Sequence, residues 1–273
     1  MLFFEKIQSK IKRPDLKRDI NKLLSFFDIR ITRASTFKML CKKSSLADAY
    51  SLLHKINTGN FENFIYNFPL SKAQLAQDLF VLSELNFKRN GFFVEFGATN
   101  GIDLSNTFLL ESEFGWKGIL AEPAKIWHNE LKKNRTAFIE KDCVWRSSNE
   151  TLTFNEVKFG ELSTIDNYTK SDKHSDTRKQ GIKYEVNTIS LSDLLDKYNA
   201  PKIIDYLSID TEGSEYEILS SFNFDRYKFK VITCEHNFTS NRDKIFSLLT
   251  KKGYERKFTD VSQFDDWYVL VKN

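Results

Sequence analysis

Short apolar runs alternate with amphipathic stretches along the chain from residue 91 onward. The apolar runs have the length of buried strands, and the stretches between them repeat apolar residues at helical spacing. Strands that alternate with helices form a mostly parallel sheet through right-handed crossovers. The pattern therefore predicts an α/β fold with a seven-stranded sheet, formed by GFFVEF, GILAE, AFIEKD, IDYLSID, FKVITCE, YERKFT and DWYVLV.

The last two of these strands are expected to pair with each other. Only DVSQFD separates them, and a parallel crossover needs a dozen or more residues. We therefore expect a C-terminal antiparallel hairpin at the end of the sheet.

The organisation of the chain changes near residue 71. Residues 1–70 look helical and contain a single glycine, Gly59, whereas five of the ten glycines fall between Gly91 and Gly118. At the change, Ser71 is a candidate N-cap for a helix over SKAQLAQDLFVLSELNFKRN. We therefore expect a helical N-terminal arm over residues 1–70 and one domain over residues 71–273.

Residues 143–190 interrupt the alternation. The segments SSNETLTFNEV and IKYEVNTISL have strand character, and the polar segment STIDNYTKSDKHSDTRKQG lies between them. This pattern predicts a hairpin inserted into the domain, with a long loop. The loop is either a surface loop or a lid that orders over substrate, because long loops in α/β enzymes often carry function.

Composition is that of a soluble globular protein, with 41% hydrophobic and 29% charged residues. No apolar run approaches the roughly 18 residues that span a bilayer. The three cysteines, Cys41, Cys143 and Cys234, are widely spaced and form no CxxC pair. Free thiols are typical of a reducing compartment, so we expect a cytoplasmic protein.

Charge is distributed unevenly along the chain. Residues 1–43 carry a balance of +8, while the whole chain carries +4. The basic arm therefore has three interpretations: it packs on the domain or on a second subunit, it contacts an anionic membrane surface, or it binds nucleic acid. The last is disfavoured because the arm has no binding motif and the remainder is slightly acidic. We expect no nucleic-acid partner.

A glycine-containing turn follows the first strand of the sheet. Its spacing is E-x-G-x-x-x-G, with Glu95, Gly97 and Gly101. Glycines at this place let a nucleotide approach the backbone, but the third glycine of the dinucleotide motif G-x-G-x-x-G is missing. An acid before the turn would repel a diphosphate. Glu95 instead suits a ligand that carries a cation, such as S-adenosylmethionine with its sulfonium and ammonium groups.

The ends of the next two strands add to this site. Glu122 ends the second strand, where an acid can bind both ribose hydroxyls of NAD or of S-adenosylmethionine. The segment KDCVW closes the third strand and places Asp142 and Cys143 near the expected adenine edge. The full candidate cofactor site is Glu95, Gly97, Ala98, Thr99, Asn100, Gly101, Ser105, Glu122, Pro123, Asp142 and Cys143.

Together, the motifs FFVEFGATNGIDLSNT, GILAEP, DYLSIDTEGSEYEIL and EHN with a following arginine resemble the FkbM family of S-adenosylmethionine-dependent methyltransferases. The resemblance covers about residues 71–273, including the lead-in helix, and leaves out residues 1–70. It implies a Rossmann-like class I methyltransferase sheet and O-methylation, often of sugars in polysaccharides or secondary metabolites. It also implies that Glu95, Gly97, Gly101 and Glu122 contact the cofactor.

The fourth and fifth strands end in residues that are candidates for catalysis. Asp210 is followed by Glu212, and Glu235 is followed by His236. Two mechanisms remain open for removing the proton of an acceptor hydroxyl. In one, His236 or Asp210 is the general base, with Glu212 close to the site. In the other, Asp210, Glu235 and His236 bind a divalent cation such as Mg²⁺, which lowers the pKa of the hydroxyl.

These features favour an O-methyltransferase acting on a small molecule or glycan, with a sugar hydroxyl of a polysaccharide or glycoconjugate as the expected acceptor. The first alternative is an NAD-dependent sugar oxidoreductase or epimerase, which the missing third glycine and Glu95 disfavour. The second is a non-catalytic nucleotide-binding module of the same fold. The sequence does not identify the acceptor, the metal requirement, the oligomeric state or the role of residues 1–70.

Overall fold

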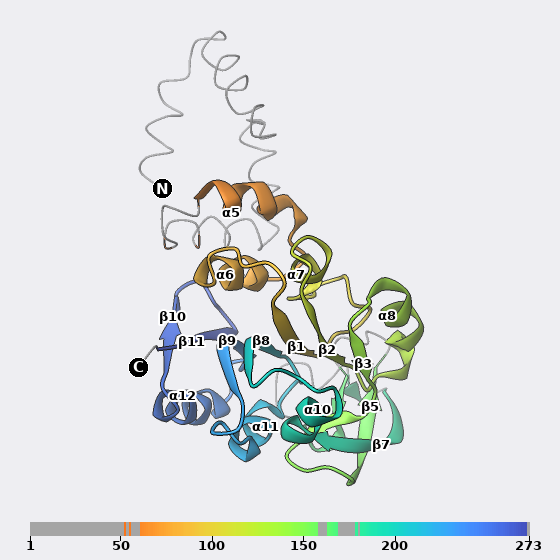
Figure 1. The fold of residues 1–273 in the computed structure, drawn as a ribbon. Helices are drawn as coiled ribbons and strands as arrows, with labels where there is room; N and C mark the ends of the chain where they lie inside the picture. The colour runs from red at the N-terminus through yellow and green to blue at the C-terminus, as the bar shows by residue number, and fades with distance from the viewer. Residues whose placement is uncertain are drawn as a thin grey trace, which may run out of the picture.

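The computed structural model describes residues 61–157, 163–168 and 181–271, together with residues 52, 55, 178 and 179. Figure 1 shows a central sheet between two layers of helices, with a smaller sheet beside it. Most of the predicted basic arm and most of the predicted lid loop lie outside the described residues, so the expectations for those segments stay predictions. Among the described residues, no helix has the length and apolar character needed to cross a bilayer.

The central sheet contains seven strands in the order β10-β11-β9-β8-β1-β2-β3. All neighbours are parallel except the two pairs that involve β11. The strands are β1 (Phe92–Phe96), β2 (Lys117–Ala121), β3 (Phe138–Glu140), β8 (Ile203–Ile209), β9 (Lys228–Glu235), β10 (Tyr254–Lys257) and β11 (Asp265–Leu270). The predicted seven-stranded, mostly parallel sheet with a C-terminal antiparallel hairpin is therefore confirmed, and β11 lies between β9 and β10.

Helices cover both faces of this sheet because each crossover leaves one apolar helix face to bury. One core cluster joins the sheet to α10, α11 and α12, and the other joins it to α6, α7 and α8. The helices, including the short 3-10 segments, are α5 (Phe61–Asn67), η2 (Phe68–Leu70), α6 (Gln77–Glu84), α7 (Phe108–Ser112), η3 (Lys125–Trp127), α8 (His128–Asn134), η5 (Asp166–Tyr168), α10 (Leu191–Lys197), α11 (Glu215–Ser221) and α12 (Asn241–Lys251).

The segment around residues 143–190 forms a second sheet of four strands. Its order is β4-β7-β5-β6, with β4 (Cys143–Trp145), β5 (Thr151–Glu156), β6 (Thr164–Ile165) and β7 (Ile182–Ser190). The strands β5 and β7 pair antiparallel. The expected run of the third strand through KDCVW is wrong, because β3 ends at Glu140 and Cys143–Trp145 pairs with β7 instead.

The helix that precedes the sheet begins later than the sequence suggests. Ser71 does not cap it: α6 starts at Gln77, and the Ser71 hydroxyl donates to the Asp78 carboxylate at 2.7 Å. Leu52 and Phe64 precede the predicted boundary at residue 71, and both are buried in the core cluster that contains α6. The described part of the preceding chain therefore packs on the domain.

Candidate active site

A large pocket lies at the carboxyl ends of the parallel strands, with an empty volume of ≈ 1030 Å³ that includes its open mouth. The strand order reverses between β8 and β1, so the pocket occupies the topological switch point of the sheet. The predicted site residues that line it are Glu95, Gly97, Thr99, Glu122, Pro123, Cys143, Asp210, Glu212 and Glu235. Those that lie outside its lining are Ala98, Asn100, Gly101, Ser105, Asp142 and His236.

Contacts within the protein are enough to require glycine at both positions of the turn. A Cβ on Gly97 would lie 2.1 Å from the backbone oxygen of Asp210, and a Cβ on Gly101 would lie 2.6 Å from Arg135 Cγ. Both glycines have positive φ, at +75° and +81°. The close neighbours that require glycine here are therefore the end of β8 and a side chain that follows α8.

Glu95 is the centre of a buried polar network behind the turn. Its carboxylate accepts hydrogen bonds from the Asn106 backbone (2.7 Å) and from the Ser105 and Thr107 hydroxyls, and it lies 3.7 Å from Arg135 Nη1. Burial raises the pKa of Glu95, while the Arg135 guanidinium and these donors act to lower it. Glu95 lines the pocket, but it also holds the loop that follows β1 in place.

Arg135 ties this network together from the end of α8. Its side chain is 1% exposed, and it pairs with Glu111 at 2.7 Å. It also donates to the Gly101 carbonyl (3.0 Å), to the Ser105 hydroxyl (3.1 Å) and to the Thr107 hydroxyl (2.8 Å). One buried cation thus fixes the turn at several points. Nothing in the sequence around Arg135 marks it as a partner of a loop some thirty residues away.

Glu122 lies at the end of β2 with its carboxylate directed at the turn. The Thr99 amide donates to Oε2 and the Ala124 amide donates to Oε1, both at 2.8 Å. Burial raises the pKa of Glu122 to about 7. Each carboxylate oxygen holds more than one lone pair, so both can accept a further hydrogen bond from a ligand in the pocket.

The small sheet forms the wall of the pocket beside Glu122. Cys143 lines the pocket within an apolar cluster that includes Trp145, Phe154 and Ile165. Burial raises the pKa of the Cys143 thiol to about 12, so it is a neutral, apolar group. Asp142 is not in the lining, because the chain leaves β3 before reaching it. This end of the pocket is suited to a flat apolar ring.

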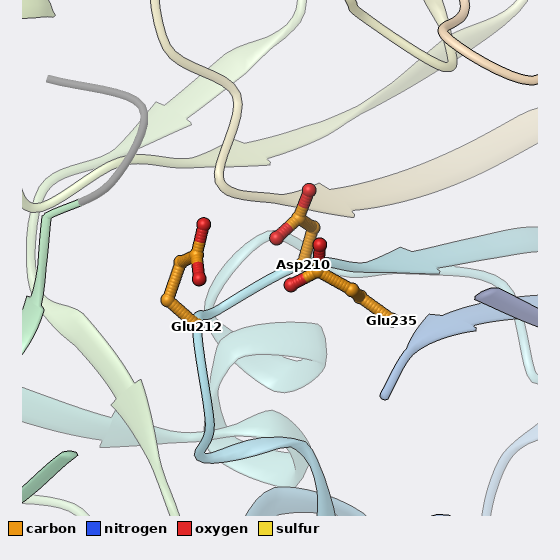
Figure 2. Close-up of side chains that lie close together, drawn as sticks. All are labelled: Asp210, Glu212 and Glu235. Carbon is orange, nitrogen blue, oxygen red and sulfur yellow. The ribbon is translucent and has the colours of Figure 1, made fainter. Parts of the chain in front are cut away.

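Three carboxylates converge at the ends of β8 and β9, as Figure 2 shows. Asp210, Glu212 and Glu235 each offer an oxygen within 4.8 Å of the others. The Asp210 and Glu235 carboxyl groups lie close enough together to share a hydrogen bond when one of them is protonated. Burial raises the pKa of both, and the charges of Asp210 and Glu212 raise that of Glu235 further. The pair can therefore accept or release a proton inside the pocket.

Glu212 has a different environment from the other two carboxylates. Arg178 Nη2 lies 2.8 Å from Glu212 Oε2, and both side chains are buried. The Asn237 side-chain amide also donates to Oε2, at 3.3 Å. Its charge is therefore already compensated by protein groups.

The expectation that His236 joins the reacting groups is not met. Its Nδ1 accepts from the Phe238 amide at 3.0 Å, and its Nε2 lies 3.8 Å from Asp266, which also pairs with Arg242 and Arg256. Side chains alternate between the two faces of an extended chain, and the residue after Glu235 consequently points away from the pocket. Glu212, and not His236, is the third member of the cluster with Asp210 and Glu235.

Several pocket residues have no counterpart in the sequence-based site. Gln77, Asn106, Thr233 and Asp265 line the pocket and come from four different segments. The acidic pair that opens the last strand, Asp265 and Asp266, could have marked that strand end. No sequence pattern identifies Gln77 as a pocket residue, because only the packing of α6 brings it to the sheet edge.

These features define the class of site: a ligand pocket at the topological switch point of an open α/β sheet, with ionisable groups at its centre. The FkbM methyltransferase domain matches residues 95–270. The match covers more than half of the chain, and the chain belongs to the FkbM methyltransferase family. The resemblance seen in the sequence motifs is thereby confirmed.

Among solved structures, the chain is similar to the methyltransferase FkbM from Methylobacillus flagellatus KT, with 13% identity and a TM-score of 0.44. That alignment covers 83% of this chain and 59% of the other. A second similar structure is precorrin-6y C5,15-methyltransferase from Geobacter metallireducens GS-15, with 12% identity, a TM-score of 0.37, and 70% and 85% of the two chains covered. No curated protein sequence matches the chain.

Family membership supports methyl transfer from S-adenosylmethionine in general terms. The chain spans 59% of the length of the Methylobacillus protein that it matches.

Proposed function

We propose that this chain is an S-adenosylmethionine-dependent O-methyltransferase that methylates a sugar hydroxyl of a polysaccharide or glycoconjugate. The observation that carries the proposal is the close approach of the Asp210 and Glu235 carboxyl groups in the pocket. The pair lies in the same pocket as Gly97 and Glu122, on the next strands of the sheet. A proton-accepting group therefore lies beside the place where a cofactor would bind.

The proposed cofactor position follows the strand ends. Glu122 accepts hydrogen bonds from the two ribose hydroxyls, and the wall around Cys143 and Val144 holds the adenine. Gly97 and Glu95 would hold the amino-acid end of the cofactor. When bound, S-adenosylmethionine supplies a methyl group on a positively charged sulfur.

The proposed proton transfer uses the carboxylate pair. Asp210, as the ionised member, accepts the proton of the acceptor hydroxyl while the oxygen forms its bond to the methyl carbon. The sulfur–methyl bond breaks, and the products are a methyl ether, S-adenosylhomocysteine and a protonated carboxyl group. A positioned proton acceptor of this kind contributes about 10²–10⁴-fold to a rate.

A divalent cation is the alternative means of activating the hydroxyl. Oxygen ligands suit Mg²⁺, and Asp210, Glu212 and Glu235 are close enough to share one ion. However, Glu212 is already paired with Arg178, and burial raises the pKa of both Asp210 and Glu235, so that a shared proton is favoured between them. These contacts favour the proton-sharing pair. Treatment with EDTA distinguishes the two, because only a metal-dependent enzyme loses turnover and regains it with Mg²⁺ or Mn²⁺.

Two measurements test the proposed function against its rivals. Calorimetric titration with S-adenosylhomocysteine and with NAD separates a methyltransferase from an oxidoreductase, and we expect heat only from the first ligand. Formation of S-adenosylhomocysteine from S-adenosylmethionine with a glycan acceptor separates an enzyme from a binding module. Tight binding of NAD would overturn the proposal.

For the cellular setting, we propose a cytoplasmic protein whose basic N-terminal arm either contacts the inner face of the membrane or packs on a second copy of the chain. The charge of residues 1–43 supports both. Co-sedimentation of the full chain with phosphatidylglycerol vesicles, and its mass in solution, distinguish these arrangements.

A further inference from the structure

The pocket extends past the proposed cofactor position to the ends of β9 and β11. The order of strand ends from Glu122 is β2, β1, β8, β9 and β11. With neighbouring strands about 4.8 Å apart, this row is roughly 19 Å long. The cofactor position proposed above uses the β2 and β1 ends, and the proposed base Asp210 lies at the β8 end. The β9–β11 end is therefore left for the methyl acceptor, and Phe264 and Asp265 line it.

Asp265 reaches this end because β11 runs against its neighbours. As the first residue of an antiparallel strand, Asp265 is the register partner of Glu235, the last residue of β9. The Gln77 and Trp267 side chains both donate to Asp265 Oδ2, each at 3.1 Å. Among the described residues, no donor contacts Oδ1. The carboxyl group is thus held by two bonds on one oxygen and offers the other to the pocket.

Gln77 orients this carboxyl group. Its Oε1 accepts from the Leu75 amide at 2.8 Å, which leaves its Nε2 directed at Asp265. Gln77 is 3% exposed, so the arrangement is buried. The lead-in helix and the last strand therefore meet at the pocket in a fixed geometry.

A second side chain presents an unused acceptor to the same pocket. Asn106 is 9% exposed, and its Nδ2 donates to the Ser208 hydroxyl at 2.9 Å. Its Oδ1 is buried and has no donor among the described residues. A buried acceptor without a donor is costly, so a ligand that brings an N–H or O–H group is favoured there.

The charge of this end restricts what can bind. Asp210, Glu235 and Asp265 all line it, and the charge of Asp210 helps to raise the pKa of both Glu235 and Asp265. A phosphate or carboxylate on the acceptor near the reacting hydroxyl would meet the same repulsion. Hydroxyl groups are instead favoured at this end, because they donate hydrogen bonds to carboxylates. Phe264 is partly exposed in the lining and offers an apolar surface.

We propose that the β9–β11 end of the pocket is the acceptor site for a neutral, hydroxyl-rich ring, in which Asp265 and Asn106 accept hydroxyl hydrogen bonds and Phe264 packs on the apolar face. The inference rests on the proposed function and narrows its substrate to sugars without phosphate or carboxylate at this end. Gln77 is the positioning residue for Asp265.

The test uses the full chain saturated with S-adenosylhomocysteine. Saturation-transfer difference NMR measures contact with a panel of neutral methyl hexosides and with the corresponding hexose 6-phosphates. We expect saturable contact with at least one methyl hexoside, and at least tenfold weaker binding of the phosphates. In Asp265→Asn and Phe264→Ala the hexoside affinity should fall at least tenfold, while S-adenosylhomocysteine affinity stays within twofold. The exposed Asp225→Asn is the matched control and should bind like the wild type.

The possible outcomes separate this inference from the function on which it rests. If S-adenosylhomocysteine itself does not bind, the proposed function fails. If it binds but no methyl hexoside does, or if the phosphates bind as well, the acceptor class is wrong. If Asp265→Asn and Phe264→Ala both bind S-adenosylhomocysteine and keep full hexoside affinity, the acceptor lies elsewhere.

Discussion

The backbone oxygen of Asp210 lies against the α-carbon of Gly97, where the strand order of the sheet reverses. A Cβ at position 97 would lie 2.1 Å from that oxygen. The contact joins the loop that is proposed to receive the cofactor to the strand end that carries the proposed base. A change at Gly97 should therefore affect both parts of the site.

Gly97→Ala should abolish S-adenosylhomocysteine binding and lower the melting temperature. The added carbon collides with the Asp210 carbonyl, and the positive φ alone costs an L-residue about 1–2 kcal/mol. Calorimetry and thermal unfolding measure the two effects. Gly253→Ala is the matched control, because Gly253 also has positive φ but a Cβ there would have its nearest neighbour at 3.8 Å. Gly253→Ala should lower the melting temperature and leave S-adenosylhomocysteine affinity unchanged. Normal binding by the Gly97 variant would contradict the role of this contact.

Glu122→Gln should weaken S-adenosylhomocysteine binding by about 1–3 kcal/mol, the scale of a lost hydrogen bond to a charged group. Burial raises the pKa of Glu122 to about 7, so the wild-type carboxylate becomes ionised as pH rises through that value. Ligand affinity should accordingly improve between pH 6 and pH 8 in the wild type and change less in the variant. Equal affinities at pH 8 would remove Glu122 from the ribose site.

The same raised pKa has a consequence for stability. Between the ordinary pKa of 4.5 and about 7, the folded protein holds the Glu122 proton more tightly than the unfolded chain does. The contribution of this group to the free energy of unfolding therefore falls as pH rises through that interval. In the absence of ligand, Glu122→Gln should lose part of this pH dependence in denaturant titrations. An unchanged slope would mean that Glu122 is ionised throughout.

Asp210→Asn should reduce turnover by about 10²-fold or more, the scale for a positioned proton acceptor. S-adenosylhomocysteine affinity should stay near normal. Burial raises the pKa of Asp210, and protonation removes the base, so kcat/KM of the wild type should fall on the acid side. The variant should lack that acid limb. His236→Ala is the informative comparison, because His236 lies outside the pocket lining and should keep the wild-type pH profile.

Arg135→Gln should destabilise the protein by about 3–5 kcal/mol, because it leaves the buried Glu95 carboxylate without its cation. Arg135 lowers the pKa of Glu95, so in the variant Glu95 should hold its proton to higher pH. The folded form then loses stability as pH rises, and the defect should be larger at pH 8 than at pH 5. Chemical denaturation measures this. The double variant Glu95→Gln with Arg135→Gln should be more stable at pH 8 than Arg135→Gln alone; a double variant no more stable would refute the pairing.

Deletion of residues 1–40 should leave S-adenosylhomocysteine affinity unchanged. Deletion of residues 1–70 should instead lower stability, because it removes Leu52 and Phe64, which are buried in the core. Loss of a fully buried aromatic side chain alone costs about 3–5 kcal/mol. Thermal unfolding and calorimetry on both truncations make the comparison. Loss of binding in a folded 1–40 deletion would show that the arm completes the site.

The sequence by itself determined the order of strands and helices around the central sheet and the position of most of its strand ends, the end of β3 being the exception. Buried strands leave apolar runs, and each run has to stop where polar groups meet the ligand edge, so Glu122, Asp210 and Glu235 were recognisable. The family was recognisable for the same reason, because its motifs are these strand ends. Local patterns such as these depend on neighbours in the chain.

Only the tertiary structure decided which side chains meet. The direction of β11 brings Asp265 beside Glu235, and the packing of α6 brings Gln77 to Asp265. His236 points away from its neighbour Glu235 because successive residues of a strand face opposite sides. These relations join residues far apart in the chain through pairing register and packing, and no local pattern in the sequence contains that information.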